Sequence, residues 1–164
     1  DLKNMACFAE IDGDNIVTRV ITWSDTEVQK FGGPYSTQIE EHVGIRMGGT
    51  WKQTSSSGTA VRKNYAGPGF TWAAGHNGFI EPKGNWRDKW TLNTDTCQWE
   101  PPHPSPSIIE TGVVWTENNI SIKQGYMTDW VDDNNRWESA VYNQDGSLES
   151  EHYWNNSSLQ WENK

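Results

Sequence analysis

Trp-Val-Asp-Asp-Asn-Asn-Arg-Trp, residues 130–137, is a run of turn-forming residues between two tryptophans that lie seven positions apart. Asn and Asp tolerate left-handed backbone and hydrogen-bond to the backbone of their own turns. Aromatic residues that flank such a turn can pair across antiparallel strands, which contributes about 0.2–1 kcal/mol per pair. The segment therefore predicts a β-hairpin in which Trp130 lies opposite Trp137.

The same arrangement recurs in the chain. Two further pairs of aromatic residues have the seven-residue spacing. In a fourth pair, around residues 93–96, the two aromatic residues lie nine positions apart. The predicted aromatic hairpin pairs are Trp72 with Phe79, Trp90 with Trp99, Trp130 with Trp137, and Trp154 with Trp161. Isolated hairpins are marginally stable, so we expect these units to pack on each other or on a partner.

The rest of the chain also favours short antiparallel strands. Residues 6–11 and 16–23 are apolar and β-branched segments around a turn at residues 12–15, which predicts an N-terminal hairpin. Residues 36–47 are the one good helix candidate, with Ile39, Val43 and Met47 on one face and two glycines after them. We therefore expect a mainly β fold with one short helix.

Tryptophan has to supply much of the core. Phe, Leu, Ile and Val together number only 27 of 164 residues, a proportion that in an acidic chain ordinarily indicates disorder. The 11 tryptophans and 5 tyrosines compensate, because each aromatic side chain can bury roughly 150–250 Å². Any tryptophan that does not face the core is expected to meet a partner.

Charge and proline content divide the chain. Residues 1–99 carry 11 acids and 10 bases, whereas residues 100–164 carry 11 acids and 3 bases, and a Pro-rich run covers residues 101–107. We predict a β domain over 1–102, a linker at 103–107 and an acidic, Trp-rich hairpin module over 108–164. Such acidity argues against nucleic acid and anionic membranes as partners, and no stretch reaches the about 20 apolar residues of a membrane span.

The sequence carries no recognisable catalytic or metal motif. Phosphate loops, HExxH, CxxC and nucleophile elbows do not occur, and the four histidines are scattered. The Asp residues near 129–145 lack EF-hand spacing, and the adjacent Glu40 and Glu41 are weak evidence for a glycosidase. We therefore expect no enzyme, no cofactor and no metal. Cys7 and Cys97 are expected to be packed free thiols, although their spacing leaves a disulfide open.

One basic and aromatic patch, Arg-Lys-Asn-Tyr at residues 62–65, suggests contact with an acidic neighbour. The alternative is an ordinary strand with a charged outer face. The residues predicted to contact a partner are Arg62, Lys63, Tyr65, Trp51 and Trp86.

Four segments carry a resemblance to a known family. They are Gly-Thr-Trp-Lys-Gln-Thr at 49–54, Arg-Lys-Asn-Tyr-Ala-Gly at 62–67, Trp-Thr-Leu-Asn at 90–93 and Thr-Cys-Gln-Trp-Glu-Pro-Pro at 96–102. In this order and spacing, and after Ala-Cys-Phe-Ala at 6–9, they resemble small virion-associated proteins of marine bacteriophages, notably cyanophages. The chain departs from that pattern at Pro68 and at residues 79–83.

The resemblance covers residues 5–102 and implies a virion protein made in the cytoplasm of a bacterial host. It implies a capsid decoration or a neck or tail accessory subunit, present in several copies and bound to capsid, neck or tail proteins. It brings no catalytic residues. The alternative function is a carbohydrate-binding module for host surface glycan, because tryptophan rings stack on sugar faces while Asn and Asp bond the hydroxyls.

Overall fold

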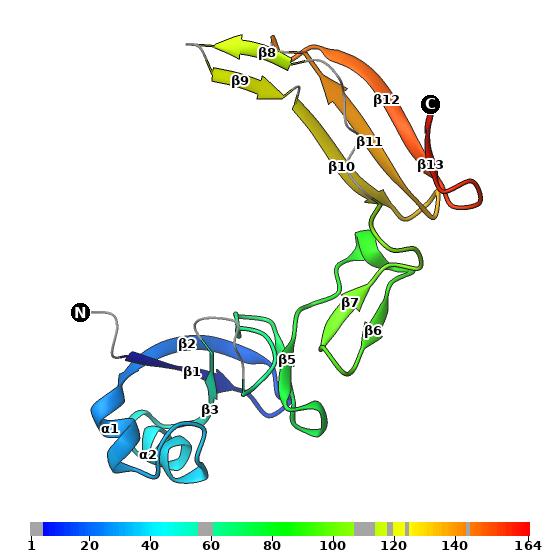
Figure 1. Ribbon diagram of the computed structural model, residues 1–164. Helices are drawn as coiled ribbons and strands as arrows, with labels where there is room; N and C mark the ends of the chain where they lie inside the picture. Colours follow the sequence, from blue (N-terminus) through cyan, green and yellow to red (C-terminus); the bar gives the residue numbers. More distant parts are fainter. Residues whose placement is uncertain (1–4, 56–60, 107–113, 118–119, 124, 144) are drawn as a thin grey trace. The chain divides into compact units, whose positions relative to one another are not determined.

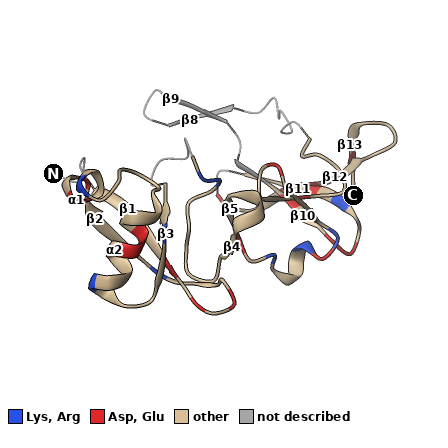
Figure 2. Ribbon diagram, turned by 90° about the horizontal axis from the view of Figure 1, so that it is seen from below, with Lys and Arg blue, Asp and Glu red and all other residues tan. Residues whose placement is uncertain are grey.

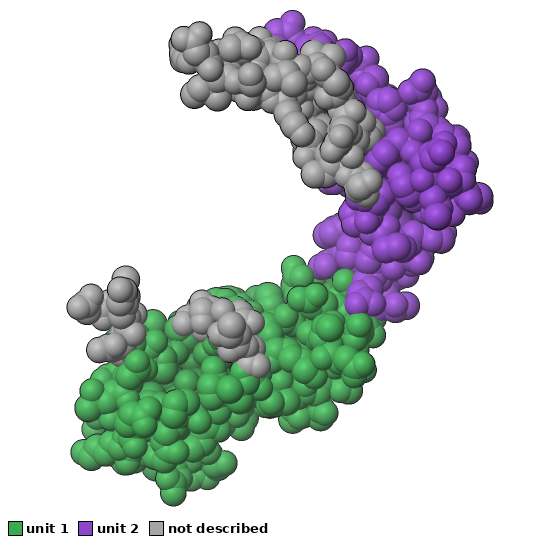
Figure 3. All heavy atoms as spheres, viewed as in Figure 1, with its two compact units in different colours: residues 1–83, 92–99 green, residues 84–91, 100–164 purple. Residues whose placement is uncertain are grey.

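The computed structural model describes residues 5–55, 61–106, 114–117, 120–123, 125–143 and 145–164. Contacts divide the chain into two compact units (Figure 3). The first consists of Asp1–Lys83 with Leu92–Trp99, and the second of Gly84–Thr91 with Glu100–Lys164.

The first unit is built on a three-stranded antiparallel sheet in the order β2-β1-β3. Its strands are β1 (Met5–Ile11), β2 (Val17–Ser24) and β3 (Thr50–Thr54). The β1–β2 turn is held by the Asp12 carboxylate, which accepts hydrogen bonds from the backbone N–H groups of Asp14 and Ile16. The N-terminal hairpin predicted from the sequence is therefore confirmed.

Two helices follow β2, α1 (Asp25–Lys30) and α2 (Thr37–Met47). The Ser36 hydroxyl caps α2 by accepting from the Ile39 N–H, and Gly48 ends it with a positive φ of 76°. The sequence predicted this helix within one residue but missed α1, whose single buried residue, Val28, gives no periodic pattern. Met47 is exposed rather than on the buried face, because the helix ends there and the chain turns away.

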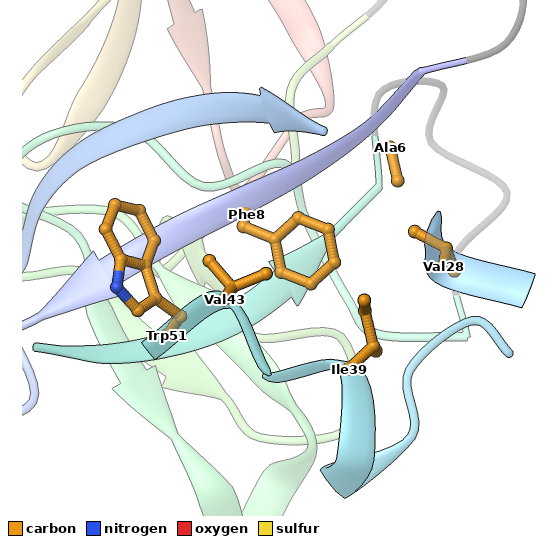
Figure 4. Close-up of a cluster of buried hydrophobic side chains, with 6 residues drawn as sticks. All are labelled: Ala6, Phe8, Val28, Ile39, Val43 and Trp51. Atoms are coloured by element: carbon orange, nitrogen blue, oxygen red, sulfur yellow. The ribbon is translucent and has the colours of Figure 1, made fainter. Parts of the chain in front are cut away.

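Strand β1 is the centre of the first unit and is buried on both faces. On one face it packs against the helices through a cluster of Ala6, Phe8, Val28, Ile39, Val43 and Trp51 (Figure 4). On the other face a second cluster contains Ala9, Ile11, Val17, Ala66, Trp72 and Phe79. Trp72 and Phe79 belong to the β4–β5 hairpin, so this hairpin completes the core.

The remaining elements are short. The first unit contains β4 (Thr71–Ala73), the 3₁₀ turn η2 (Ala74–His76) and β5 (Gly78–Ile80), and strand β6 (Thr91–Asn93) pairs with β7 (Gln98–Glu100). The 3₁₀ turn η3 (Asn85–Arg87) belongs to the second unit.

The second unit contains a four-stranded antiparallel sheet in the order β10-β11-β12-β13 (Figure 1). Its strands are β10 (Gly125–Val131), β11 (Arg136–Tyr142), β12 (Leu148–Asn155) and β13 (Gln160–Asn163). Strands β8 (Val114–Glu117) and β9 (Ile120–Lys123) form a separate hairpin. With its antiparallel sheets and Trp-containing strands, the chain is mainly β, as predicted.

The compact units differ from the segments predicted from the sequence. Residues 84–91 belong to the second unit, because the Trp90 ring lies against Trp130 and Trp137 and the backbone N–H of Lys89 donates to Asp132. The expected linker also takes part in the second unit, since the His103 carbonyl accepts from the Trp137 indole N–H at 3.0 Å.

Candidate functional site

Four hairpins in the chain share one turn geometry. In each, the residue two positions before the second aromatic has a positive φ, between 49° and 57°. These residues are Asn77, Cys97, Asn135 and Leu159. A four-residue turn that ends in left-handed backbone is a common way to join antiparallel strands. The aromatic spacing in the sequence thus reflects a repeated turn.

Three of the four predicted aromatic pairs are confirmed as cross-strand pairs. Trp72 lies opposite Phe79, Trp130 opposite Trp137, and Trp154 opposite Trp161. Their ring centroids are 4.9, 5.6 and 5.5 Å apart respectively. These contacts lie within the range that aromatic pairs prefer.

The fourth predicted pair, Trp90 with Trp99, is wrong. The residue seven positions before Trp99 is Leu92, which occupies the first aromatic position of this hairpin in β6. The Asn93 carboxamide oxygen accepts from two turn N–H groups, as that of Asn155 does in the last hairpin. A strict seven-residue spacing, together with the Asn turn shared with the last hairpin, could have predicted that Leu92 and not Trp90 belongs to this hairpin with Trp99.

Tryptophans line up across the sheet of the second unit. Glu138 of β11 lies opposite Tyr153 of β12, so the register places Trp137 level with Trp154. Together with the two cross-strand pairs, this makes a row that crosses all four strands on one face. The row consists of Trp130, Trp137, Trp154 and Trp161.

Acidic and basic residues occur along the strands of this sheet (Figure 2), and on the face opposite the tryptophans several of them pair with one another. Glu138 accepts from Lys164 at 2.7 Å and from Arg136 at 3.0 Å. Burial raises the pKa of Glu138, but these hydrogen bonds outweigh it and the net pKa is lowered. The Tyr153 hydroxyl donates to Glu162, and this bond is the main cause of the lowered pKa of Glu162. These charged groups are thus paired with other side chains of the same sheet.

The aromatic face continues into residues 84–91. The Trp90 ring lies 5.5 Å from Trp86, 6.3 Å from Trp130 and 6.4 Å from Trp137. The Arg87 guanidinium lies over the rings of Trp86 and Trp90, at 4.6 and 5.4 Å. Trp86 is 57 % exposed, so the cluster runs from the sheet face to the surface.

A cleft of about 520 Å³ opens beside this cluster. It is lined by Trp90, Trp137, Glu100, Ser105, Pro101 and Pro104. Among the described residues, the indole N–H of Trp90 is the one buried side-chain polar atom that has no hydrogen-bond partner. The cleft thus combines two tryptophans with a carboxylate and a hydroxyl, and one of these tryptophans carries a buried N–H for which the described residues supply no partner.

The first unit has a groove of about 510 Å³ between α2 and β3. Gly44 of α2 comes so close to Gly49 that a Cβ there would lie 3.0 Å from the Gly49 carbonyl oxygen. Ile45, 83 % exposed, lines the groove together with Glu41 and Lys52. The groove therefore carries an apolar side chain that the core does not use.

The structure corrects two of the residues predicted to contact a partner. Arg62 is 8 % exposed and donates to Glu40 and to the Gln53 carbonyl, while its guanidinium lies over Trp72. Trp51 is 2 % exposed, packs in the helix-side core and donates to the Gly48 carbonyl. Both are therefore structural, because long-range contacts bury them.

The other three predicted contact residues differ among themselves. The Lys63 ammonium donates to the His76 carbonyl at 2.8 Å, and its backbone bridges to β5. Tyr65 and Trp86 are exposed. Tyr65 hydrogen-bonds to Cys7, whose pKa burial raises. Of the predicted set, Tyr65 and Trp86 are thus the ones open to a partner.

Glu40 organises the buried charges of the first unit, a role that the sequence did not indicate. Its carboxylate accepts from Lys52 at 3.0 Å, from the Gln53 backbone N–H at 3.0 Å and from Arg62. The neighbouring Glu41 is exposed. The adjacent acid pair thus has one structural member and one solvated member.

Both cysteines are buried free thiols, as expected. Within the described residues, no three His, Cys, Asp or Glu side chains are grouped to hold a metal ion. No helix in the described part of the chain is long and apolar enough to cross a membrane. Comparisons with protein-family models, curated proteins and solved structures found no match.

Proposed function

We propose that this protein is a non-enzymatic structural protein of a bacteriophage particle that acts through protein–protein assembly. It serves as a capsid decoration or as a neck or tail accessory subunit, in several copies. The resemblance of residues 5–102 to virion-associated phage proteins supports the proposal that the protein belongs to a bacteriophage particle. The α2–β3 groove is the observation that carries the assembly role.

The groove suits an apolar contact because α2 presents the exposed Ile45 side chain there. Ile39 and Val43 already supply its contribution to the core, so Ile45 is available to a partner. A single exposed hydrophobic residue is ordinary on a protein surface, and it is the adjoining groove that gives Ile45 a place to contact a partner. Full burial of such a side chain contributes about 1.5–3 kcal/mol, or roughly ten- to hundredfold in affinity.

Charge favours the first unit as the attachment surface. The first unit carries 10 acids against 8 bases, so several copies can lie together with little repulsion. The second unit carries 12 acids against 5 bases and would repel its own copies if packed face to face. We therefore assign attachment to the first unit.

The test uses the full chain and phage particles assembled without it. We expect the protein to be retained on such particles after sedimentation, and Ile45→Asp to weaken retention about tenfold or more. Met47→Asp is the matched control, since Met47 is an exposed apolar residue of the same helix that does not line the groove.

Two results would contradict the proposal at different levels. Failure of the unmodified protein to bind particles would overturn the virion role. Equal binding of both variants would overturn the groove as the contact. A screen of the purified protein against peptidoglycan, polysaccharide and ester substrates is expected to show no turnover. Activity lost on substitution of one acid or histidine would refute a non-enzymatic function.

A further inference from the structure

We propose that the cleft of the second unit is a binding site for a neutral carbohydrate. This site is separate from the α2–β3 groove proposed for assembly, because all residues that line the cleft belong to the second unit and the groove belongs to the first. Its volume of about 520 Å³ falls within the about 300–1,000 Å³ of small-molecule sites.

The walls of the cleft match the two kinds of surface that a sugar ring presents. The Trp90 and Trp137 rings are inclined at 58° with centroids 6.4 Å apart, and they offer apolar faces for the C–H groups of a pyranose. Pro101 and Pro104 extend this apolar lining. Glu100 and Ser105 supply oxygen atoms for ligand hydroxyls, so apolar and polar groups converge as in most ligand sites.

The unsatisfied indole N–H of Trp90 adds a reason for an oxygen-rich ligand. A buried donor without a partner is unfavourable by about 1–3 kcal/mol, and within the described residues the Trp90 Nε1–H is such a donor. A ligand oxygen that accepts from this N–H would remove the penalty. A purely apolar occupant would leave it unsatisfied.

The charge of the second unit disfavours an anionic ligand. The cleft contains the Glu100 carboxylate, and residues 100–164 carry 11 acids against 3 bases. This field disfavours phosphate groups and acidic sugars. The Arg87 guanidinium lies over the rings of Trp86 and Trp90, and no basic residue is among the described residues that line the cleft itself.

The experiment titrates the full chain with cello-, malto-, laminari- and xylohexaose, and binding is detected by calorimetry and by tryptophan fluorescence. We expect saturable binding of at least one neutral hexasaccharide and none of oligogalacturonate. Glu100→Gln and Trp90→Phe are each expected to weaken binding about tenfold, since the first replaces a charged acceptor by a weaker neutral one and the second removes the indole donor. Glu149→Gln, an exposed acid outside the cleft, is expected to leave binding unchanged.

Thermal melting of each variant verifies that it folds, and Trp90→Phe keeps an aromatic ring in the cluster. The inference is overturned if no neutral hexasaccharide binds. It is also overturned if both cleft variants bind as tightly as the unmodified protein, or if a proline-rich peptide binds this cleft and the sugars do not. None of these results bears on retention of the protein by phage particles.

Discussion

Replacing Glu40 by Gln removes the negative charge at the centre of the first unit while keeping the size of the side chain. Glu40 and Arg62 are both more than nine-tenths buried, and the carboxylate also accepts from Lys52 and from the Gln53 N–H. Removing one partner of a buried ion pair destabilises a protein by about 3–5 kcal/mol, because the remaining charge lacks compensation. Gln retains one acceptor oxygen, so we expect about 3 kcal/mol.

The assay is urea unfolding of the full chain, monitored by amide hydrogen exchange at β1 and β3. These strands belong to the first unit, so the readout reports on that unit alone. With a slope of about 1.5 kcal/mol per molar urea for a unit of this size, the midpoint should fall by about 2 M. The matched control is Glu41→Gln, an exposed neighbour on the same helix, which should change stability by less than about 0.5 kcal/mol.

A second variant tests the electrostatic cause. Replacing both Glu40 and Arg62 by Gln removes both members of this buried ion pair, so the double variant should lose less stability than the sum of the two single ones. If Glu40→Gln destabilises the unit by less than about 1 kcal/mol, or if the two changes are additive, the buried charge cluster is not what stabilises this core.

Two further predictions concern the second unit. Leu159→Asn should raise its stability by about 1 kcal/mol, because Leu159 is 66 % exposed with a φ of 54°, a conformation that is unfavourable for Leu and tolerated by Asn; a lower melting temperature than that of the parent would contradict this. The pKa values of Glu138 and Glu162 are lowered from the ordinary value of 4.5. Both ionised carboxylates therefore stabilise the folded state at pH values above 4.5, and this stabilisation is lost as the pH falls through their lowered pKa values. Melting of this unit between pH 6 and pH 3 should therefore show an acid-induced loss of stability that is shallower in Glu162→Gln; identical curves for variant and parent would exclude Glu162 as a source.

The sequence by itself determined the local structure of the hairpins. Asn and Asp turns and seven-residue aromatic spacing predicted the pairing of Trp130 with Trp137 and of Trp154 with Trp161, because the geometry of a tight turn fixes which residues lie opposite each other. Helix α2 could also be predicted, since its cap and its terminal glycines are local signals.

Only the tertiary structure decided which polar and aromatic residues are buried. Arg62 looks like a surface cation beside Lys63, yet it pairs with Glu40, 22 positions earlier in the chain. Trp90 looks like half of a hairpin, yet it packs on Trp130 and Trp137. A turn constrains neighbours within a few residues, whereas the burial of a long side chain depends on which distant element meets it, and no local pattern specifies that partner.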